Sequence, residues 1–140
     1  MSESSFWNLL RTKIGMVGHF ERVENAVGDG TPDVSYCISG VEGWIELKSR
    51  TKAPARTTTS VFIEKGLRDS QVGWAKTRLR HGGNIWILAR VGRMSYLVHG
   101  EHCEVFNTWT LAELTRNAHW SGAGNWVGLV AMLRTRSVTT

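Results

Sequence analysis

Residues 32–48 read PDVSYCISGVEGWIELK, and their alternation of apolar and polar side chains decides the fold class. Over 34–38 every second residue is apolar, which predicts a half-buried β-strand. The segment Trp44–Ser49 continues with the same period and places Glu46 and Lys48 on one face, because successive side chains of a strand point to opposite sides. Gly40–Gly43 between them is rich in turn formers and predicts a hairpin.

The segments on either side of this hairpin predict an α/β fold. Three helices are predicted from their capping residues: Ser4 or Ser5, Asp69 or Ser70, and Thr110, which caps Leu111–Ala118. Four further strands are predicted at 61–63, 85–91, 94–99 and 104–106. The segment 126–133 fits either a helix or a strand. The apolar run at 85–91 is typical of a strand covered on both faces. This order predicts a mixed central β-sheet flanked by helices.

Composition is that of one ordinary globular domain spanning residues 1–140, with 41% hydrophobic and 21% charged residues. No apolar run is long enough for a membrane span, and the first residues lack the pattern of a secretory signal. Cys37 and Cys103 lie far apart without a CxxC pattern, which excludes a cysteine-rich zinc site. We therefore expect a cytoplasmic protein.

Charge is distributed unevenly along the chain. Residues 1–47 carry 7 acidic and 3 basic side chains, whereas residues 48–93 carry 11 basic and 2 acidic ones. A basic middle segment in a chain of net charge +5 favours a polyanionic partner, most simply nucleic acid. The alternative interpretation is a solvated basic surface without a partner.

Asp33, Glu46 and Lys48 form the constellation that carries chemistry. Neighbouring strands lie about 4.8 Å apart and same-face neighbours about 7 Å apart, so these three side chains converge across the hairpin. Two carboxylates at that distance suit Mg²⁺, and a lysine beside them can position a water or neutralise charge on a phosphate. The pattern predicts metal-assisted phosphodiester hydrolysis. A turn residue at Asp33 and an exposed polar strand face are the structural alternatives.

The same residues resemble the signature of the PD-(D/E)xK nuclease superfamily. Arg22–Asn25 and Gly30–Val34 precede Glu46-Leu47-Lys48, and Leu67-Arg68, Gln71–Trp74 and Gly82-Gly83 follow. This order is similar to that of the small VRR-NUC and phage-encoded Holliday-junction-resolvase-like nucleases. The resemblance covers about residues 3–98, and it leaves 99–140 as a C-terminal extension that could fill a core or form a dimer contact.

The resemblance implies a restriction-endonuclease-like core and a role for each matching residue. Asp33 and Glu46 would be metal ligands, with the Leu47 carbonyl completing the metal sphere, and Lys48 would be the catalytic lysine. Gln71, on the following helix, would face the active site and help hold water or phosphate; the alternative is an exposed polar residue of that helix. The family also uses a further glutamate, for which Glu24 is preferred here and Glu3 and Glu21 stay open. The implied cofactor is Mg²⁺, for which Mn²⁺ can substitute. The implied assembly is a homodimer in the cytoplasm, which is that of the host cell if the chain is phage-encoded.

The expected substrate is DNA, with branched or four-way-junction DNA implied by the resemblance. Basic side chains of the middle segment would contact its phosphates: Arg50, Lys52, Arg56, Lys65, Arg68 and Arg78. Trp44 and Trp74 lie on predicted core elements, where packing is favoured over base stacking. The alternative function is a nucleic-acid-binding accessory protein or a virion protein that keeps a nuclease fold without catalysis.

Overall fold

The computed structural model describes residues 1–23 and 29–135, and in this part of the chain six strands form one sheet. The strands follow the spatial order β1 (His19–Arg22), β2 (Val34–Ile38), β3 (Val41–Arg50), β4 (Ile85–Val91), β5 (Met94–His99) and β6 (Trp120–Gly122). The helices are α1 (Glu3–Ile14), α2 (Asp69–Arg80), α3 (Leu111–Asn117) and α4 (Trp126–Leu133), with 3₁₀ turns η2 (Gly100–His102) and η3 (Phe106–Thr108).

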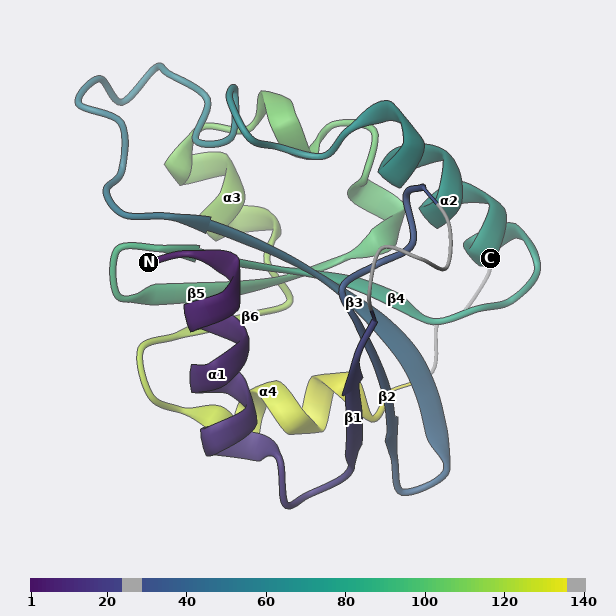
Figure 1. Ribbon diagram of the computed structural model, residues 1–140. Helices are drawn as coiled ribbons and strands as arrows, with labels where there is room; N and C mark the ends of the chain where they lie inside the picture. Colours follow the sequence, from purple (N-terminus) through teal and green to yellow (C-terminus); the bar gives the residue numbers. More distant parts are fainter. Residues whose placement is uncertain (24–28, 136–140) are drawn as a thin grey trace.

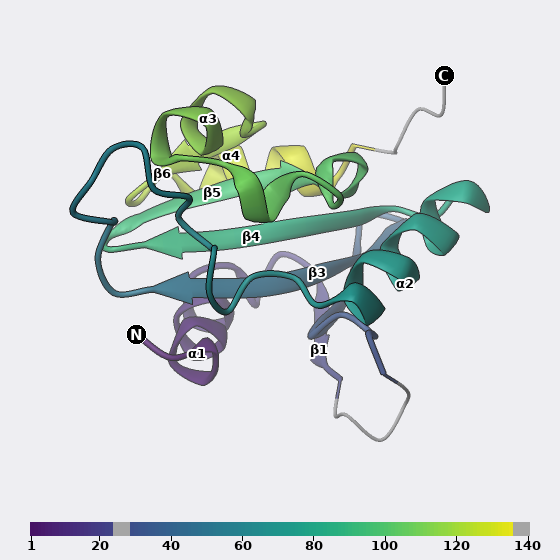
Figure 2. The same ribbon diagram turned by 90° about the horizontal axis from the view of Figure 1, so that it is seen from above.

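The sheet is mixed, because β3 and β4 pair in parallel whereas all other neighbours are antiparallel. Helix α2 lies in the crossover between the two parallel strands. Figures 1 and 2 show α1 and α4 on one face of the sheet and α2 and α3 on the other. A separate hydrophobic cluster fills each side. The predicted α/β architecture with a mixed central sheet is confirmed.

Strand β3 borders both clusters and separates apolar from polar side chains. Ile45 and Leu47 are buried in the cluster beneath α1 and α4. Glu46 and Lys48 point to the opposite face and are also buried, with exposed fractions of 3% and 7%. The alternation predicted for this strand therefore holds, but its polar face is covered by other parts of the chain instead of being open to water.

The predicted turn at Gly40–Gly43 is wrong in its position. The hairpin turns at Ser39 and Gly40, whose φ angles are 52° and 82°, as a two-residue turn of type I′ requires. Strand β3 therefore begins at Val41 and includes Gly43. A Cβ atom at Gly43 would lie only 2.5 Å from the Tyr36 hydroxyl, so glycine here makes room for that ring across the strand pair.

The predicted strands at 61–63 and 104–106 are wrong, because both segments form turns, with 3₁₀ turn η3 beginning at Phe106. Their apolar residues are buried from irregular backbone. Phe62 stacks on Phe106 at a ring distance of 5.2 Å, and the Val61 N–H donates to the Trp109 carbonyl. A short apolar run indicates burial but does not show whether the backbone pairs in a sheet.

The helix starts differ from the predictions at two of three positions. Ser2 caps α1 by accepting from the Ser5 N–H. At α2 the N-cap is Arg68, whose N–H donates to the Gln71 side chain at 2.9 Å. Thr110 caps α3 as predicted, in a capping box with Glu113.

The C-terminal residues up to 135 continue the same sheet and cores. Strand β6 pairs with β5, α4 is a helix, and Leu129 and Leu133 are fully buried. Trp109 and Trp120 are buried in the two clusters, and Trp126 packs against one of them. Among the described residues, no helix has the length and hydrophobicity to cross a membrane.

A buried hydroxyl connects the C-terminal segment to the sheet. Tyr36 Oη donates to the Leu133 carbonyl at 2.9 Å and accepts from Asn84 Nδ2 at 2.9 Å and from Trp86 Nε1 at 3.1 Å. We expect Tyr36→Phe to lower the free energy of unfolding by about 1–3 kcal/mol, because the buried Trp86 N–H loses its acceptor. Urea denaturation measures this change.

Tyr96→Phe is the matched control. Tyr96 is also buried in the sheet, but its hydroxyl has no hydrogen-bond partner among residues 1–23 and 29–135. Its loss should change stability by less than about 0.5 kcal/mol. Equal effects of the two substitutions would contradict the role assigned to the Tyr36 hydroxyl.

Candidate active site

Three carboxylates from different elements meet at one edge of the polar face of β3. Glu3 lies in the first turn of α1, Asp33 directly precedes β2, and Glu46 lies in the middle of β3. One carboxylate oxygen from each lies within 4.8 Å of the others. No other group of three potential metal-ligating side chains converges in this way within the described part of the chain.

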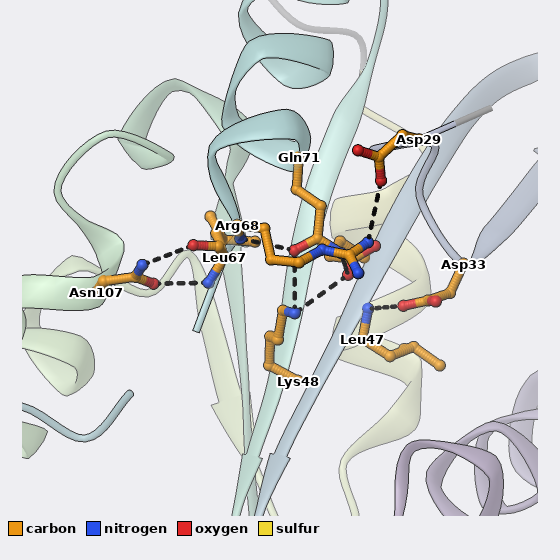
Figure 3. A network of polar contacts seen from close by, with 9 residues as sticks. Asp29, Asp33, Leu47, Lys48, Leu67, Arg68, Gln71 and Asn107 are labelled. Carbon is orange, nitrogen blue, oxygen red and sulfur yellow. Dashed lines mark hydrogen bonds and ion pairs between the residues drawn. The ribbon is translucent and has the colours of Figure 1, made fainter. Parts of the chain in front are cut away.

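Asp33 is positioned by the backbone of β3. Pairing between β2 and β3 stops at Val34 opposite Ile45, so the Leu47 N–H has no strand partner beyond that point. The Asp33 carboxylate accepts this N–H at 2.8 Å, as Figure 3 shows. The hairpin thus holds Asp33 beside Glu46, as its alternation predicts.

Glu46 is the most buried of the three acids. Its Oε2 accepts from Gln71 Nε2 at 2.7 Å and lies 3.4 Å from Lys48 Nζ. Its Oε1 is buried without a hydrogen-bond partner in the described residues. Burial raises the pKa of Glu46 to about 8, and the nearby Asp33 charge adds to this shift. The Lys48 ammonium acts in the opposite direction, but its attraction is smaller than the desolvation cost.

Lys48 and Gln71 form the opposite wall of the site (Figure 3). Lys48 Nζ donates to Gln71 Oε1 at 3.2 Å, and the same oxygen accepts the Arg68 N–H that begins α2. The Gln71 amide therefore contacts Glu46 through its nitrogen and Lys48 through its oxygen. The first turn of α2 is thereby tied to the polar face of β3.

Of the acids considered as the additional ligand, Glu3 is the one in this cluster. Glu24 lies outside the described residues, and Glu21 is exposed and pairs with His19 at 3.2 Å. Partial burial raises the pKa of Glu3, and the neighbouring Asp33 charge raises it further. No local sequence pattern marks Glu3, because its approach depends on how α1 packs against the sheet.

Contacts around Glu3 hold the start of α1 in place. Arg22 of β1 donates to Ser4 Oγ at 3.1 Å. Ser49 at the end of β3 donates to the Met1 carbonyl at 2.6 Å. The first turn of α1 is therefore fixed between the two strands that border the acids.

The Leu47 carbonyl lies on the same side of β3 as the Leu47 N–H, toward Asp33. Extending the β2–β3 register beyond Val34 places Pro32 opposite Leu47. Proline has no N–H to donate, so strand pairing does not occupy this carbonyl. It is available as a further hard oxygen donor.

These donors fit a divalent metal ion. Three carboxylate oxygens converge, and one of the three carboxylates, that of Glu46, has a buried oxygen without a hydrogen-bond partner in the described residues. Such an arrangement is unfavourable without a cation, because like charges and desolvation both act against ionisation. Oxygen-only donors suit hard cations such as Mg²⁺.

The six basic residues predicted to bind DNA have different surroundings. Lys52, Arg56 and Lys65 are exposed on the irregular segment 51–68. Arg50 donates to the Val61 carbonyl at 2.8 Å, so part of its guanidinium supports that segment. Arg68 lies 3.7 Å from Asp29, and Arg78 lies over the rings of two tryptophans.

Comparison with known proteins supports the fold. No family model matches the sequence, and no curated protein matches it either. Among solved structures, the Holliday junction resolvase Hjc of the archaeal hyperthermophile Archaeoglobus fulgidus is similar, with a TM-score of 0.52 and 18% sequence identity over 70% of this chain and 77% of that chain. This likeness shows a shared α/β fold, in agreement with the predicted fold class.

The raised pKa of Glu46 predicts how stability depends on pH in the metal-free protein. The folded state keeps the Glu46 proton up to about pH 8, whereas the unfolded state loses it near the ordinary value of 4.5. The folded state binds more protons in this window, so the free energy of unfolding should fall as pH rises through it. Urea denaturation with a chelator present measures the slope.

Glu46→Gln removes the titrating group and keeps a side chain of similar shape. We expect this variant to lack the Glu46 contribution and to show a flatter dependence across the same window. An unchanged slope would mean that Glu46 is ionised throughout and that other groups produce the dependence.

Proposed function

We propose that this chain is a divalent-metal-dependent endonuclease that hydrolyses phosphodiester bonds in DNA, with branched DNA as its substrate. The observation that carries the proposal is the convergence of the Glu3, Asp33 and Glu46 carboxylates beside the buried Lys48. One oxygen of Glu46 is buried without a hydrogen-bond partner in the described residues. The motif resemblance to PD-(D/E)xK nucleases of the VRR-NUC and resolvase-like type supports it. The fold shared with a Holliday junction resolvase is consistent with it.

Asp33, Glu46 and the Leu47 carbonyl would hold the metal, with Glu3 as the further acid that the described structure brings to them. Mg²⁺ is the expected ion, and Mn²⁺ can substitute, because both accept oxygen ligands. When bound, the ion would supply positive charge to the scissile phosphate and lower the pKa of a bound water.

Lys48 acts on the reacting groups from the other side of the site. Its ammonium has three N–H donors; one donates to Gln71 Oε1, and the ammonium forms an ion pair with Glu46 Oε2 at 3.4 Å. The remaining donor can bind a phosphate oxygen or the attacking water. Gln71 is a positioning residue, because it orients both Lys48 and Glu46 without needing to touch DNA.

The exposed basic side chains beside this site are proposed DNA contacts. Lys52, Arg56 and Lys65 follow β3, and Arg68 begins α2 beside Gln71. Phosphate contacts of this kind add affinity without sequence preference. Arg50 and Arg78 are further proposed contacts, and Arg50 also donates to the Val61 carbonyl of segment 51–68 at 2.8 Å.

A homodimer is part of the proposal. Cutting both strands of a four-way junction needs two active sites, and a two-fold axis between identical chains supplies them. The oligomeric state can be measured by sedimentation with and without junction DNA.

Plasmid nicking separates catalysis from binding alone. Nicks that require Mg²⁺ and disappear with EDTA support the endonuclease. Salt-sensitive retention of DNA without cleavage would instead support a nucleic-acid-binding accessory protein. A chain that does neither would fit a structural protein on a nuclease fold.

Asp33→Asn and Glu46→Gln should each abolish cleavage and leave the fold and DNA binding largely intact. Both amides preserve side-chain volume but remove the negative charge that the metal requires. The assay is Mg²⁺-dependent nicking at equal concentrations of folded protein. Near-wild-type cleavage by either variant would refute the metal-site assignment.

Lys48→Ala should lower the single-turnover cleavage rate by roughly 10² or more, the scale of losing one preorganised electrostatic donor. Affinity for DNA should change little, because Lys48 is buried and is not an exposed phosphate contact. Weaker binding with an unchanged single-turnover rate would show that Lys48 only contacts phosphate.

A further inference from the structure

Arg78, near the end of α2, is exposed and yet held in a defined position. Its guanidinium carbon lies 4.4 Å from the ring centroid of Trp74 and 5.5 Å from that of Trp44. A Cβ atom at Gly83 would lie 2.4 Å from Cγ and 2.5 Å from Cδ of Arg78. Glycine at this position therefore leaves room for the aliphatic part of the Arg78 side chain. Within the described residues the guanidinium forms neither hydrogen bond nor ion pair, which leaves its five donors available.

Two hollows lie on either side of Arg78. The first has a volume of about 650 Å³ and is bordered by Trp44, and the second has a volume of about 700 Å³ and is bordered by Trp74. Both extend to Arg78 and the Gly82–Gly83 turn. Volumes of about 300–1,000 Å³ are typical of sites that bind small molecules. Each hollow therefore offers an indole with the same guanidinium at its border.

Gly73 leaves the second hollow open. It lies inside α2, where glycine is less favourable than alanine. No described atom lies within 4 Å of the position that its Cβ would occupy, so packing in this part of the chain does not require glycine. Any side chain there would enter the hollow beside Trp74. The glycine is therefore better explained by a ligand that approaches the indole closely.

The tryptophans that border the hollows lie near the proposed active site. Trp44 lies two residues before Glu46 on the same face of β3, a separation of about 7 Å along a strand. Trp74 lies three residues after Gln71, about one helical turn further along α2. The two rings contact each other edge to face at 5.2 Å. A DNA strand with its scissile phosphate at the acids would extend onto this surface.

We propose that the second hollow binds an unpaired nucleotide next to the cleaved bond, with its base against the stacked pair of Trp74 and Arg78 and its phosphate on the N–H donors of Arg78. In a duplex both faces of a base are covered by its neighbours, whereas an unpaired base can stack on an aromatic ring or on a guanidinium plane. Arginine also binds phosphate through several parallel donors. This inference rests on the proposed function for the place of the scissile phosphate, and it makes branch points with unpaired nucleotides the preferred substrate.

The test measures binding without cleavage, in the full chain carrying Glu46→Gln and without divalent metal. The probe is DNA with 2-aminopurine in a single-stranded arm beside a branch, compared with the same base in a fully paired duplex. Gly73→Leu is the decisive addition, because leucine favours the helix but fills the hollow. We expect arm-bearing DNA to bind roughly fivefold to hundredfold more weakly, the range that loss of base stacking produces. The 2-aminopurine quenching should disappear, and duplex binding should not change.

Two further variants serve as controls. One distinguishes the contribution of guanidinium stacking from that of positive charge, and the other tests the effect of adding a leucine elsewhere on the surface. Arg78→Lys keeps the charge but loses the planar guanidinium, so it should also weaken binding of the arm and leave duplex binding unchanged. Ala112→Leu adds an exposed leucine on α3, away from both hollows, and should bind like the parent. Parental binding of the arm by both Gly73→Leu and Arg78→Lys would overturn the inference.

Failure of this inference is distinguishable from failure of the proposed function. If the wild-type chain nicks DNA with Mg²⁺ but the Gly73→Leu variant binds the arm normally, the nuclease stands and the nucleotide site is refuted. If the wild-type chain does not nick DNA but Gly73→Leu weakens binding of the arm-bearing DNA, the nucleotide site is supported and catalysis is refuted.

Discussion

A carboxylate buried in a central strand needs compensation, and the arrangement around Glu46 follows from that need. Removing an ionised carboxylate from water costs several kcal/mol unless it is paired and hydrogen-bonded. Here the Gln71 amide and the Lys48 ammonium satisfy one oxygen. The other oxygen is buried without a hydrogen-bond partner in the described residues, and the nearby Asp33 and Glu3 add negative charge to the same cluster. A bound cation would therefore offset both the desolvation of Glu46 and the repulsion among the three carboxylates.

Sheet topology brings the compensating groups to this point. The parallel pairing of β3 and β4 requires a crossover, and α2 in that crossover carries Gln71 over the polar face of β3. The β2–β3 ladder ends at Val34, the residue that follows Asp33, so the unpaired Leu47 N–H becomes the anchor of the Asp33 carboxylate. The site is consequently assembled from the β2–β3 hairpin and the β3–α2–β4 crossover, both of which the fold also requires.

The two faces of β3 divide structural from functional roles. Ile45 and Leu47 belong to the core under α1 and α4, and the Tyr36 hydroxyl ties the C-terminal helix to the same side. On the opposite face the polar residues of the site pass directly into the indoles of Trp44 and Trp74 and the guanidinium of Arg78. Charged and aromatic groups on one continuous surface suit a ligand that has both phosphates and planar bases.

Local periodicity was sufficient to predict the hairpin, the shared face of Glu46 and Lys48, the approach of Asp33 and the mixed α/β sheet. These features depend on the period of two along a strand and on the pairing of neighbouring segments, both of which are properties of adjacent residues. The same reasoning failed for the apolar runs at 61–63 and 104–106, because burial of an apolar side chain does not require a paired backbone.

The sequence by itself therefore determined which residues could form the acid and lysine pair. Only the tertiary structure decided that Glu3 joins them and that Gln71 contacts both Glu46 and Lys48. It also decided that Trp44 and Trp74, which pack against the core as expected, border hollows on their other sides. The physical reason is that these contacts join elements distant in the chain. Their distances depend on how α1 and α2 pack on the sheet, which no local pattern of residues specifies.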